Sequence, residues 1–286
     1  MIHRRGMKRK REDMSEQQKM NRLMENEQSE WNPVYDTAME AGRILLQNGA
    51  EISRVEETME RICRHYGVET MDSFVLSNGI FITGGYGTEN AYARVGHIPV
   101  SGASLDKVVA VNQLSREVEE GKYEQVEMVK EKLDEISRMS GPKNWHRILA
   151  SGIGSGFFCV LAGGTLLDCL AAFLAGIVLY IYVVFISEKY LSKILGNIFG
   201  GAIIVAVCLL CFQLHIGNHL ENIISGAIMP MVPGVAFANG IRDIANGDYI
   251  AGSVRLLDAI LRFLCIAIGV GAAFAVYHEF TGGIML

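Results

Sequence analysis

The sequence predicts a polytopic α-helical membrane protein, in which five transmembrane helices follow an N-terminal cytoplasmic α+β domain. Two observations support this fold class. Only five of the 26 Lys and Arg residues lie after Arg147. The same half contains five apolar runs of about 20 residues, the length at which an α-helix crosses roughly 30 Å of hydrocarbon. A buried soluble core can also contain apolar helices, but five consecutive helices with almost no polar face leave no residues to face water, which favours a membrane.

We expect three regions along the chain. Residues 1–32 contain a Lys- and Arg-rich run followed by Gln, Glu and Asn, which predicts a disordered basic and polar tail. An arm that binds lipid headgroups is the alternative for this run. Residues 33–142 are predicted to form the cytoplasmic domain and residues 143–286 the membrane domain. The expected spans lie near residues 148–167, 169–187, 196–214, 223–241 and 256–277.

Hydrophobic periodicity defines the cytoplasmic domain. From Val34 to Cys63 apolar residues recur at steps of three and four, which predicts one long amphipathic helix. Short apolar runs separated by Asn-Gly and Gly-Gly then predict a strand meander over residues 74–100. Two further helices are expected, from Ser104 to Val118 and from Tyr123 to Met139. This half contains no phosphate-binding loop, dinucleotide fingerprint or nucleophile elbow, so we expect no enzyme activity.

Charges at the ends of the spans predict the orientation. Lys and Arg flank the spans on one side of the membrane, and the connections on the other side contain neither. The flanking residues are Lys143, Arg147, Lys189, Lys193, Arg242 and Arg255. The positive-inside rule then places the N-terminus in the cytoplasm and the C-terminus outside.

Polar residues inside a span are unfavourable and therefore indicate a transport pathway. Asp258 and Arg262 lie four residues apart near the inner end of the last span, and Arg255 precedes Asp258 by three, so all three share one helix face. A neutralised structural ion pair is one interpretation. The alternative is a polar cavity in which Arg262 meets an anionic substrate and Asp258 exchanges a proton.

The fourth expected span contains two prolines and a glycine. Pro230 and Pro233 each remove a backbone donor, and Gly234 permits a bend. A simple proline kink is one interpretation. A discontinuous transporter helix, whose second half offers a positive N-terminus to a carboxylate, is the other. Polar residues that follow the break complete the set of transport candidates: Asn239, Arg242 and Asp243.

Other features of the membrane half favour structural roles. Asp168 lies in the outer turn between the first two spans, where we expect it to cap a helix; proton exchange is the alternative. His215 and His219 have the spacing of metal ligands but lie in an expected loop, and five of the six cysteines lie in apolar runs, so we expect no metal or other cofactor. Glycines at four-residue spacing predict close helix packing, within the chain or in a homo-oligomer. They are Gly152, Gly156, Gly196 and Gly200.

Three stretches of the chain resemble the threonine/serine exporter family. The first is residues 45–51 with Arg54-Val55-Glu56, and the second runs from Gly163-Gly164 to Asp168. The third and most specific comprises Pro233-Gly234, Ile241-Arg242-Asp243, Gly247-Asp248, Gly252 and Arg255. The resemblance extends from about Tyr35 to the C-terminus. It implies five spans behind a cytoplasmic domain in a bacterial cytoplasmic membrane, and a second small membrane subunit in place of the second half of fused members.

The sequence therefore predicts a subunit of a secondary transporter, and the resemblance implies export of threonine, serine or a C4-dicarboxylate such as succinate. The expected partners are this small carboxylate, membrane lipid and the second small membrane subunit. The first half has a formal charge of about −3, which does not favour nucleic-acid binding. A membrane-anchored enzyme or sensor acting through the cytoplasmic domain is the alternative. An intramembrane protease would need a pair of aspartates or a Ser–His arrangement that the membrane half does not present.

Overall fold

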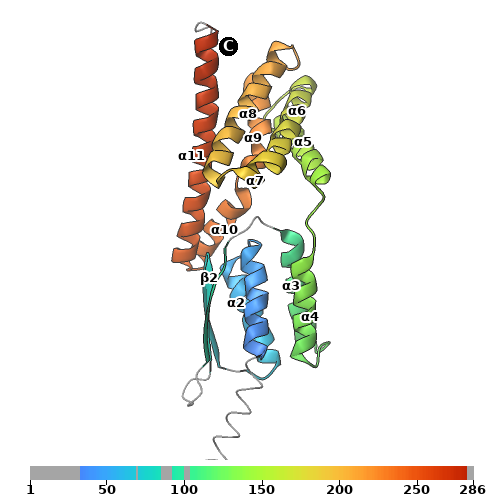
Figure 1. The fold of residues 1–286 in the computed structure, drawn as a ribbon, viewed down its shortest axis with the longest axis vertical. Coiled ribbons are helices and arrows are strands. Elements are labelled where there is room, and N and C mark those ends of the chain that lie inside the picture. The colour runs from blue at the N-terminus through green and yellow to red at the C-terminus, as the bar shows by residue number, and fades with distance from the viewer. Residues whose placement is uncertain (1–32, 69, 85–91, 100–103, 282–286) are drawn as a thin grey trace, which may run out of the picture. The chain divides into compact units, whose positions relative to one another are not determined.

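The structure, a computed structural model, describes residues 33–68, 70–84, 92–99 and 104–281 (Figure 1). The tail predicted over residues 1–32 lies outside the described residues. The chain divides into two compact units. The first combines the described part of Met1–Met139 with Asn239–Val254, and the second combines Ser140–Ala238 with the described part of Arg255–Leu286. A segment from the second half of the sequence thus belongs to the N-terminal unit.

The first unit begins with two helices, over residues 33–47 and Ile52–His65 (α2). They replace the single helix predicted from Val34 to Cys63. The chain turns at Gly49, whose φ of 84° lies in the left-handed region that glycine adopts readily and other residues do not. Apolar side chains keep their three-to-four-residue spacing through this turn, so periodicity does not reveal the break.

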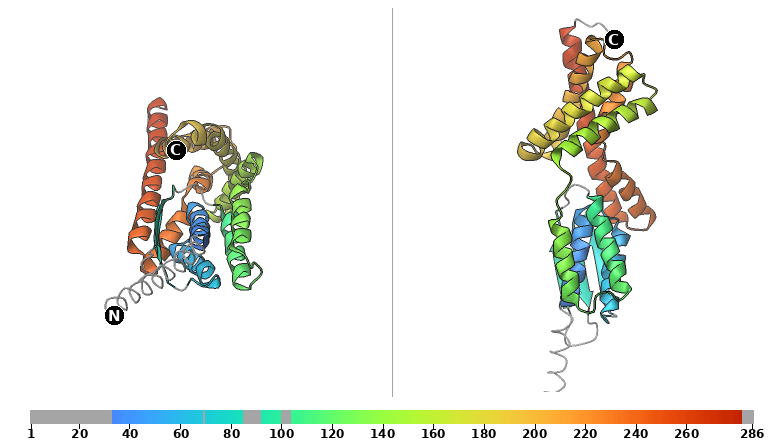
Figure 2. Two further views of the ribbon diagram at one scale, coloured as in Figure 1. Left: turned by 60° about the horizontal axis from the view of Figure 1, so that its bottom comes forward. Right: turned by 90° about the vertical axis from the view of Figure 1, so that its right-hand side faces the viewer.

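Three strands and two further helices complete the first unit: β1 (Met71–Leu76), β2 (Gly79–Gly84), β3 (Tyr92–His97), α3 (Leu105–Glu119) and α4 (Val126–Arg138). The strands form the predicted meander, antiparallel in the order β1-β2-β3, with Phe74 opposite Phe81. The sheet lies on one side of α2, and α3 and α4 lie on the other (Figures 1 and 2). Ile80 and Ile82 are fully buried on the face toward the helices, and the core also includes Ala251.

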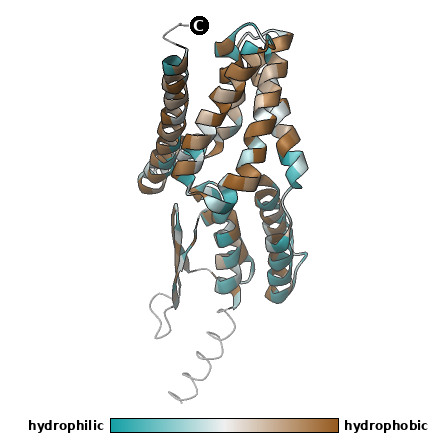
Figure 3. Ribbon diagram, turned by 45° about the horizontal axis from the view of Figure 1, so that its top comes forward, coloured by the Kyte–Doolittle hydropathy of each residue, from teal (hydrophilic) through white to brown (hydrophobic). Residues whose placement is uncertain are grey.

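The second unit consists of helices, two of which, α10 and α11, also contribute residues to the first unit. They are α5 (Asn144–Leu161), α6 (Leu166–Tyr182), a π-helical stretch (Val183–Ser187), α7 (Glu188–Tyr190), α8 (Lys193–Gln213), α9 (Leu220–Ile228), a 3₁₀ turn (Met229–Met231), α10 (Gly234–Ala245) and α11 (Tyr249–Phe280). Figure 3 shows hydrophobic residues along most of these helices, whereas the helices of the first unit alternate between hydrophobic and hydrophilic. This is the pattern of a membrane-embedded bundle.

Length and composition support three to four of the five predicted spans. Among the described residues, three helical stretches are long and apolar enough to cross a membrane: Leu166–Tyr190, Lys193–Gln213 and Tyr249–Phe280. The span predicted over residues 223–241 is instead a broken pair, Leu220–Met231 and Gly234–Ala245, bent by 65°. α5 begins with polar residues and is less apolar than α6 or α8, so the first span remains a prediction.

Glycines allow the helices of the second unit to approach closely. A Cβ on Gly152 of α5 would lie 2.8 Å from the Ile177 side chain on α6, and one on Gly201 of α8 would lie 2.6 Å from the Ile266 carbonyl oxygen on α11. A Cβ on Gly269 would likewise overlap the Ile198 carbonyl oxygen. Gly152 therefore packs within the chain, one of the two roles expected for this set. The α8–α11 contact depends on Gly201 and Gly269, which are not among the glycines predicted from four-residue spacing.

Candidate functional site

Residues from two distant parts of the sequence meet at the turn between the helix over residues 33–47 and α2. The Asn239 side chain donates from Nδ2 to the Gly49 carbonyl oxygen at 2.8 Å. The Ile52 amide donates to Asp243 Oδ1 at 3.1 Å. Ile52 is the first residue of α2, and the carboxylate of Asp243 is completely buried. Because a helix N-terminus carries free N–H groups and partial positive charge, Asp243 caps α2 from another part of the chain.

Exposed polar contacts surround this buried cap. Arg242 forms an ion pair with Glu51, the N-cap residue of α2, and Asn246 Nδ2 contacts Ser53 Oγ at 3.4 Å. The Glu51 side chain makes no capping hydrogen bond to its own helix. Asp243 therefore supplies the carboxylate that caps α2. The side chain of Glu51, the N-cap residue itself, pairs with Arg242 instead of capping the helix.

A pair of carboxylates lies in the same unit. Glu56 of α2 accepts a hydrogen bond from the Val75 amide at 3.4 Å. Burial of Glu56 and the nearby negative charge of Asp248 raise the pKa of the Glu56 carboxyl group, which the Val75 hydrogen bond offsets in part. Asp248 immediately precedes α11, so protonation of Glu56 would reduce repulsion where α10 turns into α11.

The second candidate region is the broken helix pair of the second unit. The bend lies between Met231 and Gly234, at the place where Pro233 interrupts the helix. Phe237, in the first turn of α10, packs edge-on against Phe263 of α11 with ring centroids 6.1 Å apart. The start of α10 therefore packs against the segment of α11 that contains Arg262.

The charges of that face form an ion pair. Arg262 donates to Asp258 at 2.7 Å, and both side chains are partly exposed. The Arg262 Nε atom is buried and has no hydrogen-bond partner among the described residues. A guanidinium with an unsatisfied donor can bind a carboxylate ligand.

Asp168 is saturated with hydrogen bonds. Thr165 donates to it from its backbone N at 2.7 Å and from its hydroxyl at 2.8 Å, as in a capping box at the start of α6. The amides of Asn218 and His219 donate to the other carboxylate oxygen, and His219 Nδ1 lies 3.0 Å from the first. The side chain is completely buried. Asp168 thus caps its own helix and holds the loop before α9.

The family model for threonine/serine exporters, ThrE, matches residues 36–277. This chain belongs to that family. Proteins named "Probable succinate transporter subunit YjjP" are similar to it: one from Klebsiella aerogenes is 23% identical over 255 residues, 89% of this chain and 98% of that protein. One from Escherichia coli K12 is 23% identical over 241 residues, 84% and 93% of the two chains.

A more distant relative is an uncharacterized protein of Schizosaccharomyces pombe, 24% identical over 191 residues, which are 62% of this chain and 22% of that protein. No solved structure matches the exporter. Membership in ThrE places this chain in a family of membrane transporters.

The structure separates the predicted transport residues of the exporter into three groups. Asn239, Arg242 and Asp243 meet the turn in the first unit, where they contact protein groups. The broken helix and the α11 face hold the second group: Pro233, Gly234, Arg255, Asp258 and Arg262. Asp168 lies apart from both, in the cap of α6.

The turn at Gly49 is not among the site residues that the sequence predicts. Gly49 and Glu51 belong to the first family-like stretch, and Asn48-Gly49 is a dipeptide typical of turns. That dipeptide was the available signal, although it does not identify residues 239–246 as the partner. Among the described residues, no group of three or more His, Cys, Asp or Glu side chains is placed to hold a metal ion.

Proposed function

We propose that this chain is the larger subunit of a secondary exporter for small carboxylate-bearing metabolites, either threonine and serine or a C4-dicarboxylate such as succinate. Membership in ThrE and the names of the YjjP relatives support this substrate class. Because those relatives are named as subunits, we propose a separate small membrane subunit as partner. We also propose that copies of this chain associate into homo-oligomers.

In this proposal the chain has five spans in a bacterial cytoplasmic membrane, with α5 as the first, and residues 33–142 form a cytoplasmic domain at the inner side. Residues 143–238 and 255–286 form the membrane domain and contact lipid, and segment 239–254 packs with the residues of the cytoplasmic domain. The distribution of Lys and Arg supports a cytoplasmic N-terminus. The many exposed apolar side chains of α5, among them Phe157 and Leu161, are consistent with a lipid environment.

The observation that carries the proposal is the 65° break between α9 and α10, whose second half packs through Phe237 against Phe263 of α11. The half-helix that begins at Gly234 presents the positive end of its dipole, and the Gly234 amide itself donates to the Val232 carbonyl oxygen at 2.8 Å. Arg262 offers the buried Nε donor, so both features favour a substrate carboxylate. Asp258, paired with Arg262, would take up or release the coupling proton as the substrate displaces it. Asp168 is a weaker candidate for this role because five donors already stabilise its charged form.

Efflux from preloaded cells tests the function. Cells that lack this chain would be loaded with labelled succinate, threonine or serine and complemented with the chain alone, with the small subunit alone, or with both. We expect efflux of one substrate only from the pair, and loss of at least about tenfold in rate with Arg262→Met. Absence of efflux for all three substrates would contradict the proposal and favour a sensor that acts through the first unit.

A further inference from the structure

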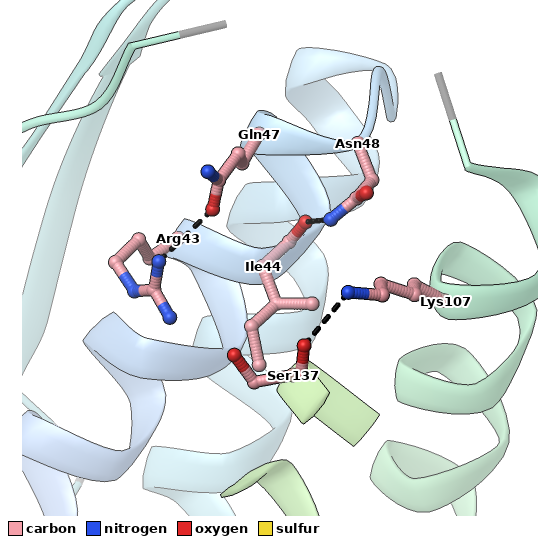
Figure 4. Close-up of a pocket in the computed structure, with 6 residues that line it drawn as sticks. All are labelled: Arg43, Ile44, Gln47, Asn48, Lys107 and Ser137. Carbon is pink, nitrogen blue, oxygen red and sulfur yellow. Dashed lines mark hydrogen bonds between the residues drawn. The ribbon is translucent and has the colours of Figure 1, made fainter. Parts of the chain in front are cut away.

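A polar cavity of about 210 Å³ lies in the first unit, beside the end of the helix over residues 33–47 (Figure 4). Its walls come from that helix, α3 and the end of α4, and they present almost only polar atoms. The lining residues are Arg43, Ile44, Gln47, Asn48, Lys107 and Ser137. None of them belongs to the candidate transport residues. The volume is below that of a drug-sized site and suits a metabolite of on the order of ten non-hydrogen atoms.

The two cations in this cavity differ in how their charges are balanced. Arg43 donates from Nε to Glu40 at 2.7 Å and from Nη1 to Gln47 Oε1 at 2.9 Å, and Asp134 adds further negative charge nearby. Lys107 donates from Nζ to the Ser137 carbonyl oxygen at 2.7 Å and forms no ion pair with any residue that the structure describes. An ammonium group has three donors. Lys107 therefore brings an unbalanced positive charge and spare donors to a polar cavity.

We propose that this cavity binds a small carboxylate anion, with Lys107 as its charge partner. The Asn48 amide group, which donates to Ile44 O at 2.7 Å and is almost buried, offers further hydrogen-bonding capacity at the same wall. A monovalent or divalent organic acid fits the polarity, the charge and the volume together. The site is separate from the proposed transport pathway, and the inference does not require that its ligand be the exported substrate.

The position of the cavity indicates what the ligand would do. Gln47 and Asn48 immediately precede Gly49, whose carbonyl oxygen accepts the Asn239 hydrogen bond. Asn48 O also accepts from the Ser104 amide, which precedes α3. A ligand that rigidifies this turn would thereby stabilise the contacts that segment 239–254 makes within the first unit. The cavity is thus a regulatory site, through which the concentration of such an acid acts on the docking of segment 239–254.

Titration calorimetry on the full chain in detergent tests the site, with succinate as the probe. We expect saturable binding that Lys107→Met weakens by about tenfold or more and that Lys107→Arg retains. Lys132→Met is the matched control, because Lys132 is an exposed lysine of the same unit that pairs with Glu135. Succinamide, the uncharged diamide, should not compete. No succinate binding by the wild-type chain, or equal binding by Lys107→Met, would overturn the proposal.

Two further measurements separate this site from the transport pathway and from a purely structural lysine. Arg262→Met should leave the Lys107-dependent binding intact, and succinate should slow hydrogen exchange of the amides at residues 44–52. If Arg262→Met abolishes all binding while Lys107→Met does not, the cavity is not a carboxylate site, although the proposed function stands. A Lys107 that only caps α4 would lower the unfolding temperature when replaced and leave succinate affinity unchanged, which also overturns the proposal.

Discussion

Two completely buried aspartates, one in each unit, stabilise helix N-termini by different routes. Asp168 lies in the first turn of the helix that it caps, and its partner Thr165 is three residues away. Asp243 caps α2 across 191 residues of sequence. A local cap stabilises its helix wherever that helix goes, whereas a cap supplied from afar exists only when two segments are docked. Asp168 therefore stabilises α6 locally, whereas the cap made by Asp243 forms only when segment 239–254 is docked against α2.

The two carboxylates have similar surroundings. Each is completely buried, and the polar residues around it are exposed or half-buried: Thr165, Asn218 and His219 at Asp168, and Asn239, Arg242 and Asn246 at Asp243. The two caps therefore differ in the sequence distance that they span and not in their exposure. Only the cap made by Asp243 depends on the docking of segment 239–254.

The largest effect is expected from Asp168→Ala. The substitution leaves the amides of Thr165, Asn218 and His219 without an acceptor and should lower the free energy of unfolding by about 3 kcal/mol. Thermal unfolding in detergent measures the loss, and hydrogen exchange should localise it to residues 165–169 and 216–220. Asp168→Asn, which keeps one acceptor oxygen, should fall between the alanine variant and the wild type. An unchanged unfolding temperature for Asp168→Ala would show that water replaces the carboxylate.

A smaller effect, about 2 kcal/mol, is expected from Asp243→Asn because α2 loses the charge at its N-terminus but retains a neutral acceptor. Hydrogen exchange should accelerate at two places far apart in the sequence, residues 50–54 and 240–250, and remain unchanged elsewhere. Asp106→Asn is the matched control, since Asp106 is an exposed acid in the first turn of α3. Acceleration at residues 50–54 alone would mean that Asp243 is not required for docking.

The same contrast explains how much of the structure the sequence predicts. Thr165 and Asp168 stand three residues apart ahead of an apolar run, and Pro230 with Pro233 interrupt another, so the α6 cap and the broken helix are both predictable. Local physics determines these features.

The turn at Gly49 and the return of residues 239–254 to the first unit are not predictable in this way. Leu45 and Ile52 are seven residues apart, which keeps the helical phase across the turn and conceals it. Asn239, Arg242 and Asp243 follow an apolar run, and polar residues in that position suggest a substrate site as readily as a protein contact. Asn239 and Asp243 contact the backbone of a turn 190 and 191 residues earlier, and Arg242 contacts the Glu51 side chain there. Single-sequence patterns carry no information about such pairs.

The third prediction concerns pH and the Glu56–Asp248 pair of the docked segment. Burial and Asp248 raise the pKa of Glu56 in the folded state above its value in the unfolded chain. The folded state therefore binds a proton more tightly, and this contribution to stability is lost as pH rises from the unfolded pKa through the folded one. Glu56→Gln should raise stability at pH 7 by less than about 1 kcal/mol after allowance for solvent screening.

Unfolding temperatures at pH 5 and pH 8 provide the measurement for this pair. The difference between the two values should shrink in Glu56→Gln, whose amide oxygen can still accept from the Val75 amide. Glu57→Gln is the control, because Glu57 is exposed and pairs with Arg61. If the unfolding temperature depends on pH equally in the wild type and in Glu56→Gln, titration of Glu56 does not affect the docking of segment 239–254.

The smallest effect is expected from Arg242→Gln. The Arg242–Glu51 ion pair joins the first and third family-like stretches. Because the Arg242 side chain is 58% exposed, loss of this pair should lower the free energy of unfolding by about 0.5 kcal/mol or less. Equilibrium unfolding with Asp243→Asn measured in parallel gives the ratio of the two contributions. If Arg242→Gln instead matches Asp243→Asn, the exposed pair and the buried cap act as one network, and docking of segment 239–254 depends on charge at its surface as well as on the buried carboxylate.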